Sequence, residues 1–171
     1  GVTVAFIGAI AGDVPYKLSP GTTAGLTFND PVAKINTLAK QLKQDGTAQI
    51  VIAMLDDDVK NNYPKMGPDV DGLMGGDTHV PYEFDHVDSA VTLTSANPLL
   101  AGVASGSYTD NLGLIQISYD TATGKVVKAD TKLIPAATVY ECGEDPETKA
   151  VVTRAQQASA AAGAEVVARG Y

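Results

Sequence analysis

The apolar segments of this chain change their spacing part-way along the sequence. In the first part, two apolar runs at residues 2–10 and 49–55 are separated by a helix-length segment, and a third short run follows at 70–74. The intervening residues 31–43 repeat apolar side chains at helical spacing after Asn29-Asp30-Pro31, which combines an N-cap with a proline at the first helical position. Residues 12–27, which contain Pro15, Ser19-Pro-Gly21 and Gly25, are predicted to form a loop. Strand, helix and strand in this order predict an α/β fold with a parallel sheet.

The second part of the sequence contains short, half-apolar segments at close spacing. Such spacing favours antiparallel pairing, and residues 119–125 contain a hairpin turn with Gly124 at the position that needs a positive φ. The sequence therefore predicts parallel strands followed by mainly antiparallel strands, in two packed sheets with helices outside. The predicted later strands are residues 79–86, 90–95, 102–108, 112–119 and 125–133.

We expect one domain followed by a C-terminal helix. A chain of 171 residues can bury a core without a disulfide or a metal. The domain is expected to span residues 1–143, and an alanine-rich helix opened by Asp145-Pro146-Glu147 is expected within residues 144–171. That helix either docks on the core or links to a further domain. The first apolar run begins at residue 2, so the chain is either a fragment of a longer protein or a complete small domain.

The charge balance excludes several classes of partner. The chain has 20 acidic and 12 basic residues and a formal net charge of −8, with no basic block to bind a nucleic acid polymer or an anionic membrane surface. A small phosphate ester is compatible with this charge if bound cations supply positive charge. The apolar runs are too short to span a bilayer. The single cysteine, Cys142, is either an inert buried thiol or half of a disulfide to a segment not present here.

Two segments that could bind a cation follow predicted parallel strands. Asp56-Asp57-Asp58 ends the second strand, and Gly75-Gly76-Asp77-Thr78-His79 ends the third. Because the carboxyl ends of parallel strands share one edge of a sheet, Asp56, Asp77 and His79 are candidate ligands of a divalent cation such as Mn, Zn or Mg. The structural alternative is that the aspartates cap turns and helices and that His79 is a turn residue. His86 is expected at the surface.

Several segments, taken in order, resemble one protein family. They are Ala5-Phe-Ile-Gly8, Gly25-Leu-Thr-Phe-Asn-Asp-Pro31, Gln49-Ile-Val-Ile-Ala-Met54, Val70-Asp-Gly-Leu-Met-Gly-Gly-Asp-Thr-His79 and Gly106-Ser-Tyr-Thr-Asp-Asn-Leu-Gly113. The ordered set is similar to the second half of the catalytic domain of 5'-nucleotidases and 2',3'-cyclic phosphodiesterases, which are calcineurin-like metallophosphoesterases. The resemblance covers nearly the whole chain, including the last helix, which in the family leads toward a substrate-binding domain.

The resemblance implies a four-layer α/β/β/α sandwich that holds two metal ions and activates water against a phosphate ester. His79 matches the last histidine of the family's Gly-His-x-His, whereas Asp77 stands in place of the first. Asp56, or Asp57 if the loop is shifted by one residue, stands where the family has a histidine after the second strand. The two carboxylates favour Mg, Mn or Ca over Zn, or else indicate that a metal site has been lost. The family's remaining ligands belong to a first half that this chain does not contain.

The sequence is compatible with three functions. The first is part of a secreted, periplasmic or cell-surface 5'-nucleotidase-like hydrolase of nucleotides or other small phosphate esters. The second is a non-catalytic binding or interaction domain that kept the fold and lost the metals, which Asp56 and Asp77 favour. The third is an acidic cation-binding module built on residues 56–58 and Asp77. The strand at residues 2–10 has no earlier partner in the chain, so we expect a missing N-terminal half, a companion chain or another copy to cover a large apolar face.

Overall fold

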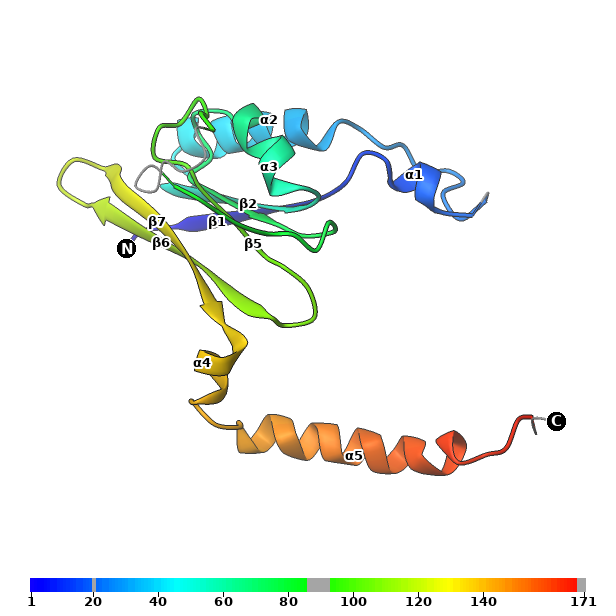
Figure 1. The fold of residues 1–171 in the computed structure, drawn as a ribbon. Helices are drawn as coiled ribbons and strands as arrows, with labels where there is room; N and C mark the ends of the chain where they lie inside the picture. Colours follow the sequence, from blue (N-terminus) through cyan, green and yellow to red (C-terminus); the bar gives the residue numbers. More distant parts are fainter. Residues whose placement is uncertain (20, 86–92, 169–171) are drawn as a thin grey trace. The chain divides into compact units, whose positions relative to one another are not determined.

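The computed structural model describes residues 1–19, 21–85 and 93–168 (Figure 1). The chain divides into two compact units, Gly1–Ala136 and Ala137–Tyr171. No helix in the described ranges has the length and apolar character needed to cross a membrane. The domain boundary expected at residue 143 stays a prediction.

A five-stranded sheet forms the centre of the first unit, in the order β1-β2-β3-β5-β4. β1 (Val4–Ile10), β2 (Ile50–Asp56) and β3 (Gly72–Gly75) are parallel neighbours. This arrangement confirms the parallel sheet predicted from the strand, helix and strand spacing. β4 (Pro81–Phe84) is antiparallel to β5 (Ala101–Ser105), as expected for a strand in the second part of the sequence.

β5 corrects one part of the prediction. The sequence places this segment in the antiparallel series, but β5 also pairs in parallel with β3, with Gly72 opposite Ala101. After β3, the chain first forms β4 at the edge of the sheet. It then forms β5 between β3 and β4. The close spacing of these strands in the sequence does not indicate that β5 pairs with β3 as well as with β4. The predicted strand at residues 90–95 lies largely outside the described residues, and residues 93–95 are not in a strand.

The last two strands form a separate hairpin. β6 (Asn111–Asp120) and β7 (Lys125–Pro135) pair antiparallel, and Gly124 in the turn has a φ of 70°, as the predicted hairpin requires. Figure 1 shows the hairpin on one face of the five-stranded sheet, with α2 (Pro31–Gln44) and α3 (Val59–Asn62) on the other. The first unit therefore has three layers, α/β/β, and the predicted combination of parallel and antiparallel strands is confirmed.

The α2 helix begins where the sequence supplies a cap. The Asp30 carboxylate accepts a hydrogen bond of 3.1 Å from the Ala33 amide, and Pro31 occupies the first turn. Ile35 and Ala39 are then fully buried. A single amphipathic face of α2 thus covers one side of the parallel strands.

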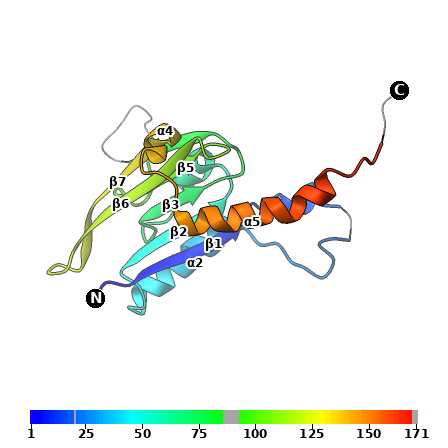
Figure 2. The same ribbon diagram turned by 90° about the horizontal axis from the view of Figure 1, so that it is seen from below.

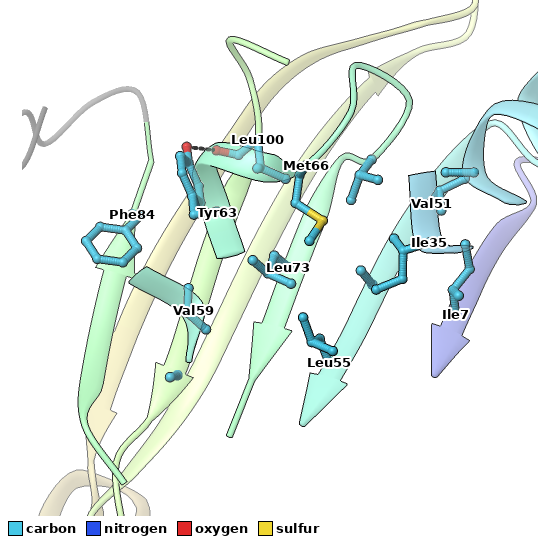
Figure 3. Packing of buried hydrophobic residues seen from close by; sticks show 14 of the residues in the cluster. Ile7, Ile35, Val51, Leu55, Val59, Tyr63, Met66, Leu73, Phe84 and Leu100 are labelled. Carbon is cyan, nitrogen blue, oxygen red and sulfur yellow. Dashed lines mark hydrogen bonds between the residues drawn. The ribbon is translucent and has the colours of Figure 1, made fainter. Parts of the chain in front are cut away.

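The main core lies between the five-stranded sheet and the helices (Figure 3). Tyr63 begins the 3₁₀ turn η1 (Tyr63–Lys65) and donates a hydrogen bond of 2.6 Å to the Leu100 carbonyl, and its ring centroid lies 5.6 Å from that of Phe84. A Cβ at Gly102 would lie 2.7 Å from the Tyr63 ring, so the strand needs glycine there. Each fully buried aliphatic side chain stabilises the fold by about 1.5–3 kcal/mol. These side chains include Ile35, Val51, Leu55, Val59, Met66 and Leu73.

A partly buried ion pair ties the start of β3 to its neighbours. Asp71 Oδ2 lies 2.7 Å from Lys43 Nζ on α2 and accepts a hydrogen bond of 2.8 Å from the Val51 amide of β2. Only 4% of the Asp71 side chain and 24% of the Lys43 side chain is exposed. Because water is largely excluded, these bonds are stronger than they would be at the surface.

The hairpin covers only part of the second face of the sheet. A Cβ at Gly72 of β3 would lie 3.4 Å from the Ile115 side chain of β6, whereas β1 is at the far edge of the sheet (Figure 2). The side chains of β1 that point to this face are exposed, as is the neighbouring one on β2. We call this group the apolar strip. It consists of Val4 (42% exposed), Phe6 (62%), Ile10 (50%) and Met54 (48%).

The second unit contains the predicted C-terminal helix, α5 (Pro146–Gly163). The Asp145 carboxylate accepts a hydrogen bond of 2.7 Å from the Thr148 amide, which lowers the pKa of Asp145 and confirms the predicted helix start. Cys142 lies between α4 (Ala136–Tyr140) and α5 and is exposed, so the buried-thiol alternative is wrong. Cys142 lies in a short connection between two helices, where its thiol is not packed in a hydrophobic core.

Candidate functional site

Four parallel strands end at one edge of the five-stranded sheet, which we call the carboxyl edge. β1 ends at Ile10, β2 at Asp56, β3 at Gly75 and β5 at Ser105. The loops after these strands lie at the same edge, where open α/β sheets bind their ligands. Both segments singled out from the sequence are therefore at this edge.

Two glycines bring the loop after β3 against the end of β2. A Cβ at Gly75 would lie 2.1 Å from a valine methyl of α3, and a Cβ at Gly76 would lie 3.1 Å from Asp56 Oδ1. A larger residue at either position would push the loop away from the end of β2. A shallow cavity of about 690 Å³, open to solvent, lies beside Asp56 and is lined on its apolar side by Ile10 and Met54 of the apolar strip.

The other two aspartates of the acidic segment have structural partners. Asp57 Oδ1 accepts a hydrogen bond of 2.7 Å from the Asp58 amide, and Asp58 caps α3 by accepting one of 2.6 Å from the Asn61 amide. Burial, and to a smaller extent the Asp58 carboxylate, raises the pKa of Tyr82. These two aspartates therefore have the capping role that was the structural alternative, and Asp56 is the one that borders the cavity.

Asp77 pairs with a lysine from the segment after β1. The one-turn helix α1 (Val14–Lys17) forms where the sequence predicts a loop. Lys17 Nζ lies 3.0 Å from Asp77 Oδ2 and 3.3 Å from Asp13 Oδ2. The hydrogen bonds from Lys17 to Asp77 and Asp13 raise the pKa of Lys17. All three side chains are between 38% and 58% exposed, so each ion pair is of the modest, surface kind.

His79 contacts an aromatic ring in the loop after β5. Its ring centroid lies 5.5 Å from that of Tyr108, and the two ring planes meet at 74°. Asp77, His79, Tyr108 and Thr109 all have positive φ, between 48° and 65°. Left-handed conformations are uncommon for residues other than glycine and gather at functional sites. Both loops at this edge therefore hold backbone conformations that need contacts to maintain them.

The structure places the three predicted ligands at one edge but does not gather them into one site. Each has a different neighbour: a glycine for Asp56, a lysine for Asp77 and an aromatic ring for His79. Within residues 1–19, 21–85 and 93–168, no group of three or more histidine, cysteine, aspartate or glutamate side chains is arranged to hold a metal ion. His86 lies outside these ranges.

The chemistry of the three side chains suits a divalent cation better than their arrangement does. Two carboxylates and an imidazole are suitable donors, and the carboxylates favour a hard cation such as Mg or Mn. As placed, they supply part of a coordination shell, and a cation that approaches Asp77 meets the Lys17 ammonium.

Sequence reasoning missed three residues at this edge. Asp13 and Lys17 lie in the predicted loop, where the spacing of two opposite charges by four residues was an available signal for a helical turn. Tyr108 carries no local signal, because its contact with His79 depends on the pairing of β3 with β5.

No family model and no curated protein sequence matches the chain. Solved structures do match it. The calcineurin-like phosphoesterase YfkN from Bacillus subtilis is similar over 77% of this chain, with a TM-score of 0.64 and 16% sequence identity. The chain shares the fold of the calcineurin-like phosphoesterases. The NAD nucleotidase NadN from Haemophilus influenzae is similar over 79% of this chain, with a TM-score of 0.57 and 20% identity.

The similarity is one of fold, and it extends over a minor part of each neighbour. The matched region covers 44% of YfkN and 25% of NadN, so this chain spans less than half of the solved structures that it resembles. The phosphoesterase fold implied by the sequence resemblance is confirmed, although the first unit has three layers, α/β/β, of the four in the implied α/β/β/α sandwich. At these identities, no functional residue of the neighbours is transferred to this chain.

Proposed function

We propose that this chain forms one half of a calcineurin-like phosphoesterase domain and that its carboxyl edge takes part in the hydrolysis of a nucleotide phosphate ester when the second half is in place. The observation that carries the proposal is the apolar strip, together with the fold that the chain shares with two phosphate-ester enzymes. Catalysis is assigned to the assembled domain, not to this chain alone. The proposed location is outside the cytoplasm: secreted, periplasmic or at the cell surface.

The proposed partner is a polypeptide segment that carries a second β-sheet, either a preceding half of the same protein or a companion chain. On the β3–β5 side of the sheet, the hairpin already packs face to face with it, as in two-sheet sandwiches. The apolar strip continues the same face beyond the hairpin, with Phe6 and Met54 exposed. A sheet with an apolar inner face is therefore the partner whose chemistry fits the strip.

The proposed metal ligands from this half are His79, Asp77 and Asp56. A divalent cation, when bound, would neutralise phosphate charge and activate a water molecule. The chain's own contribution is to hold the donors at one edge: Gly75 and Gly76 set the loop beside Asp56, and Tyr108 packs against the His79 ring. With a formal net charge of −8, the chain needs such a cation to attract a phosphate ester.

A second candidate function is a non-catalytic binding or interaction domain. The ion pair between Lys17 and Asp77 favours it, because that carboxylate already has a cationic partner. The acidic-module alternative has less support, because Asp57 and Asp58 are engaged in backbone hydrogen bonds.

Metal titration combined with hydrolysis of a nucleoside 5'-monophosphate separates the first two candidates. We expect Mn to bind the complete protein, His79→Ala to lose most of the binding and hydrolysis, and His86→Ala, the chain's other histidine, to retain both. Calorimetry with Mn, Zn and Ca measures the binding. If no cation produces heat, or if His79→Ala binds as the wild type does, the metal proposal fails and the non-catalytic domain is the better account.

Assembly is tested separately on the apolar strip. Phe6→Ser should weaken association with the segment that carries the second sheet, measured by sedimentation velocity, because it removes the most exposed member of the strip. Leu26→Ser is the matched control, since Leu26 is 65% exposed but lies in the loop before α2. Equal association of both variants with the partner would contradict the proposed interface.

A further inference from the structure

We infer that the Lys17 ammonium is the resident cation of Asp77, holding the loop at residues 76–79 without a metal, and that a divalent cation reaches Asp77 by displacing it. The displacement part rests on the proposed function, whereas the loop-holding part stands on the contacts of Lys17 alone. Lys17 Nζ is bonded to Asp77 Oδ2 at 3.0 Å and is also 3.3 Å from Asp13 Oδ2.

The helical turn that carries Lys17 is anchored at the carboxyl edge. Ala11, which is 3% exposed, donates its amide to the Asp56 carbonyl at 3.2 Å, and its own carbonyl accepts from the Val14 amide at 3.3 Å. The Tyr16 amide closes the turn on the Asp13 carbonyl at 2.9 Å. The segment that presents Lys17 is therefore attached to the end of β2, beside the glycine loop of β3.

The loop on the other side of the ion pair needs outside contacts. Asp77 and His79 have φ values of 58° and 59°, and such conformations persist where surrounding contacts maintain them. Within the loop, the Thr78 amide donates to the Gly76 carbonyl at 2.6 Å. Contacts from outside the loop are the hydrogen bond of 3.3 Å from the Gly76 amide to the Asp57 carbonyl, the ion pair of Lys17 with Asp77 and the ring contact of Tyr108 with His79.

An ammonium and a divalent cation cannot share Asp77 Oδ2 without bringing two positive charges together. Lys17 also has Asp13 as a second carboxylate partner, so it is drawn to this edge from two sides. Electrostatic repulsion therefore makes the two cations competitors for Asp77. Removing the ammonium should loosen the loop when metal is absent and improve cation binding when metal is present.

The test compares Lys17→Met with the wild-type protein by two measurements. Hydrogen exchange of the Gly76 and Thr78 amides, made without metal, reports on the loop. Paramagnetic broadening of the Asp77 and His79 resonances during titration with Mn reports on the cation. Lys40→Met is the matched control, because Lys40 is an exposed lysine on α2, away from this edge.

We expect Lys17→Met to speed exchange of these two amides and to lower the Mn dissociation constant, each by about two- to five-fold, the factor that corresponds to an exposed ion pair. Lys40→Met should change neither quantity. Unchanged exchange in Lys17→Met would overturn the inference about the loop. Unchanged Mn affinity would overturn the competition while leaving the metal ligands in place. If neither wild type nor Lys17→Met binds Mn, the competition fails together with the proposed metal ligands, and the exchange result still decides the loop.

Discussion

The Asp71 carboxylate lies 2.7 Å from the Lys43 ammonium at the edge of the sheet opposite the candidate site. The pair joins α2 to the start of β3, and the Val51 amide adds a bond from β2. It is therefore the point at which the helix layer and two parallel strands are tied together by charge as well as by packing.

Lys43→Met should destabilise the protein by about 2–4 kcal/mol, because it leaves the buried Asp71 charge with a backbone amide as its remaining partner. The free energy of unfolding is measured by urea denaturation. Lys40→Met, an exposed lysine on the same helix, should change it by less than about 0.5 kcal/mol. Similar losses for the two variants would show that the pair adds nothing beyond surface charge.

Tyr63→Phe should cost about 1–2 kcal/mol at neutral pH, because the Leu100 carbonyl loses its hydrogen bond of 2.6 Å in a buried place. Burial, with a smaller contribution from Asp85, raises the pKa of Tyr63 above its usual value of about 10. The neutral phenol is thus favoured by folding, so its contribution is complete below pH 10 and is lost as the pH rises through the folded-state pKa. Urea titrations between neutral and alkaline pH should show this loss in the wild type and its reduction in Tyr63→Phe.

Gly75→Ala should destabilise the first unit by about 1–3 kcal/mol, because a Cβ there would lie 2.9 Å from the Asp57 carbonyl as well as 2.1 Å from a side chain of α3. Gly8→Ala is the matched control in β1, since its Cβ would meet no atom within 4 Å. Thermal unfolding compares the two. Equal losses would mean that the strand penalises any added methyl group and that the close approach at Gly75 is unimportant.

Tyr108→Ala should shift the imidazole proton resonances of His79, because the two rings lie edge to face with centroids 5.5 Å apart. Tyr108→Phe keeps a ring in place and should leave these resonances close to those of the wild type. Proton NMR at constant pH makes the comparison. If Tyr108→Phe and Tyr108→Ala shift His79 equally, the ring contact is not what positions the imidazole.

Signals within a segment of the sequence were sufficient to predict some helices and strands but not the pairing of every strand. The α2 helix and the strands β1 and β2 could be predicted because their apolar spacing and the cap at Asp30 lie within the segments themselves. The pairing of β5 with β3 could not be predicted, because it joins two strands that are separated in the sequence by another strand, β4.

The location of the candidate site could also be predicted from the sequence, whereas its side-chain contacts could not. Strand direction alone predicts which residues reach the carboxyl edge, and Asp56, Asp77 and His79 do reach it. The direction of each side chain depends on neighbours that are distant in sequence, such as Lys17 for Asp77. Sequence reasoning therefore located the edge and missed the contacts that separate its members.

β1 is an edge strand that pairs with β2 on one side, and no strand of the described residues pairs with its other side. Its seven residues, VAFIGAI, contain no charge and no proline, the two features with which edge strands resist unwanted pairing. An uncovered strand of this kind promotes edge-to-edge aggregation. If the proposed second sheet covers β1, its supply and that of this chain have to be matched in time, because an excess of this chain is prone to aggregate.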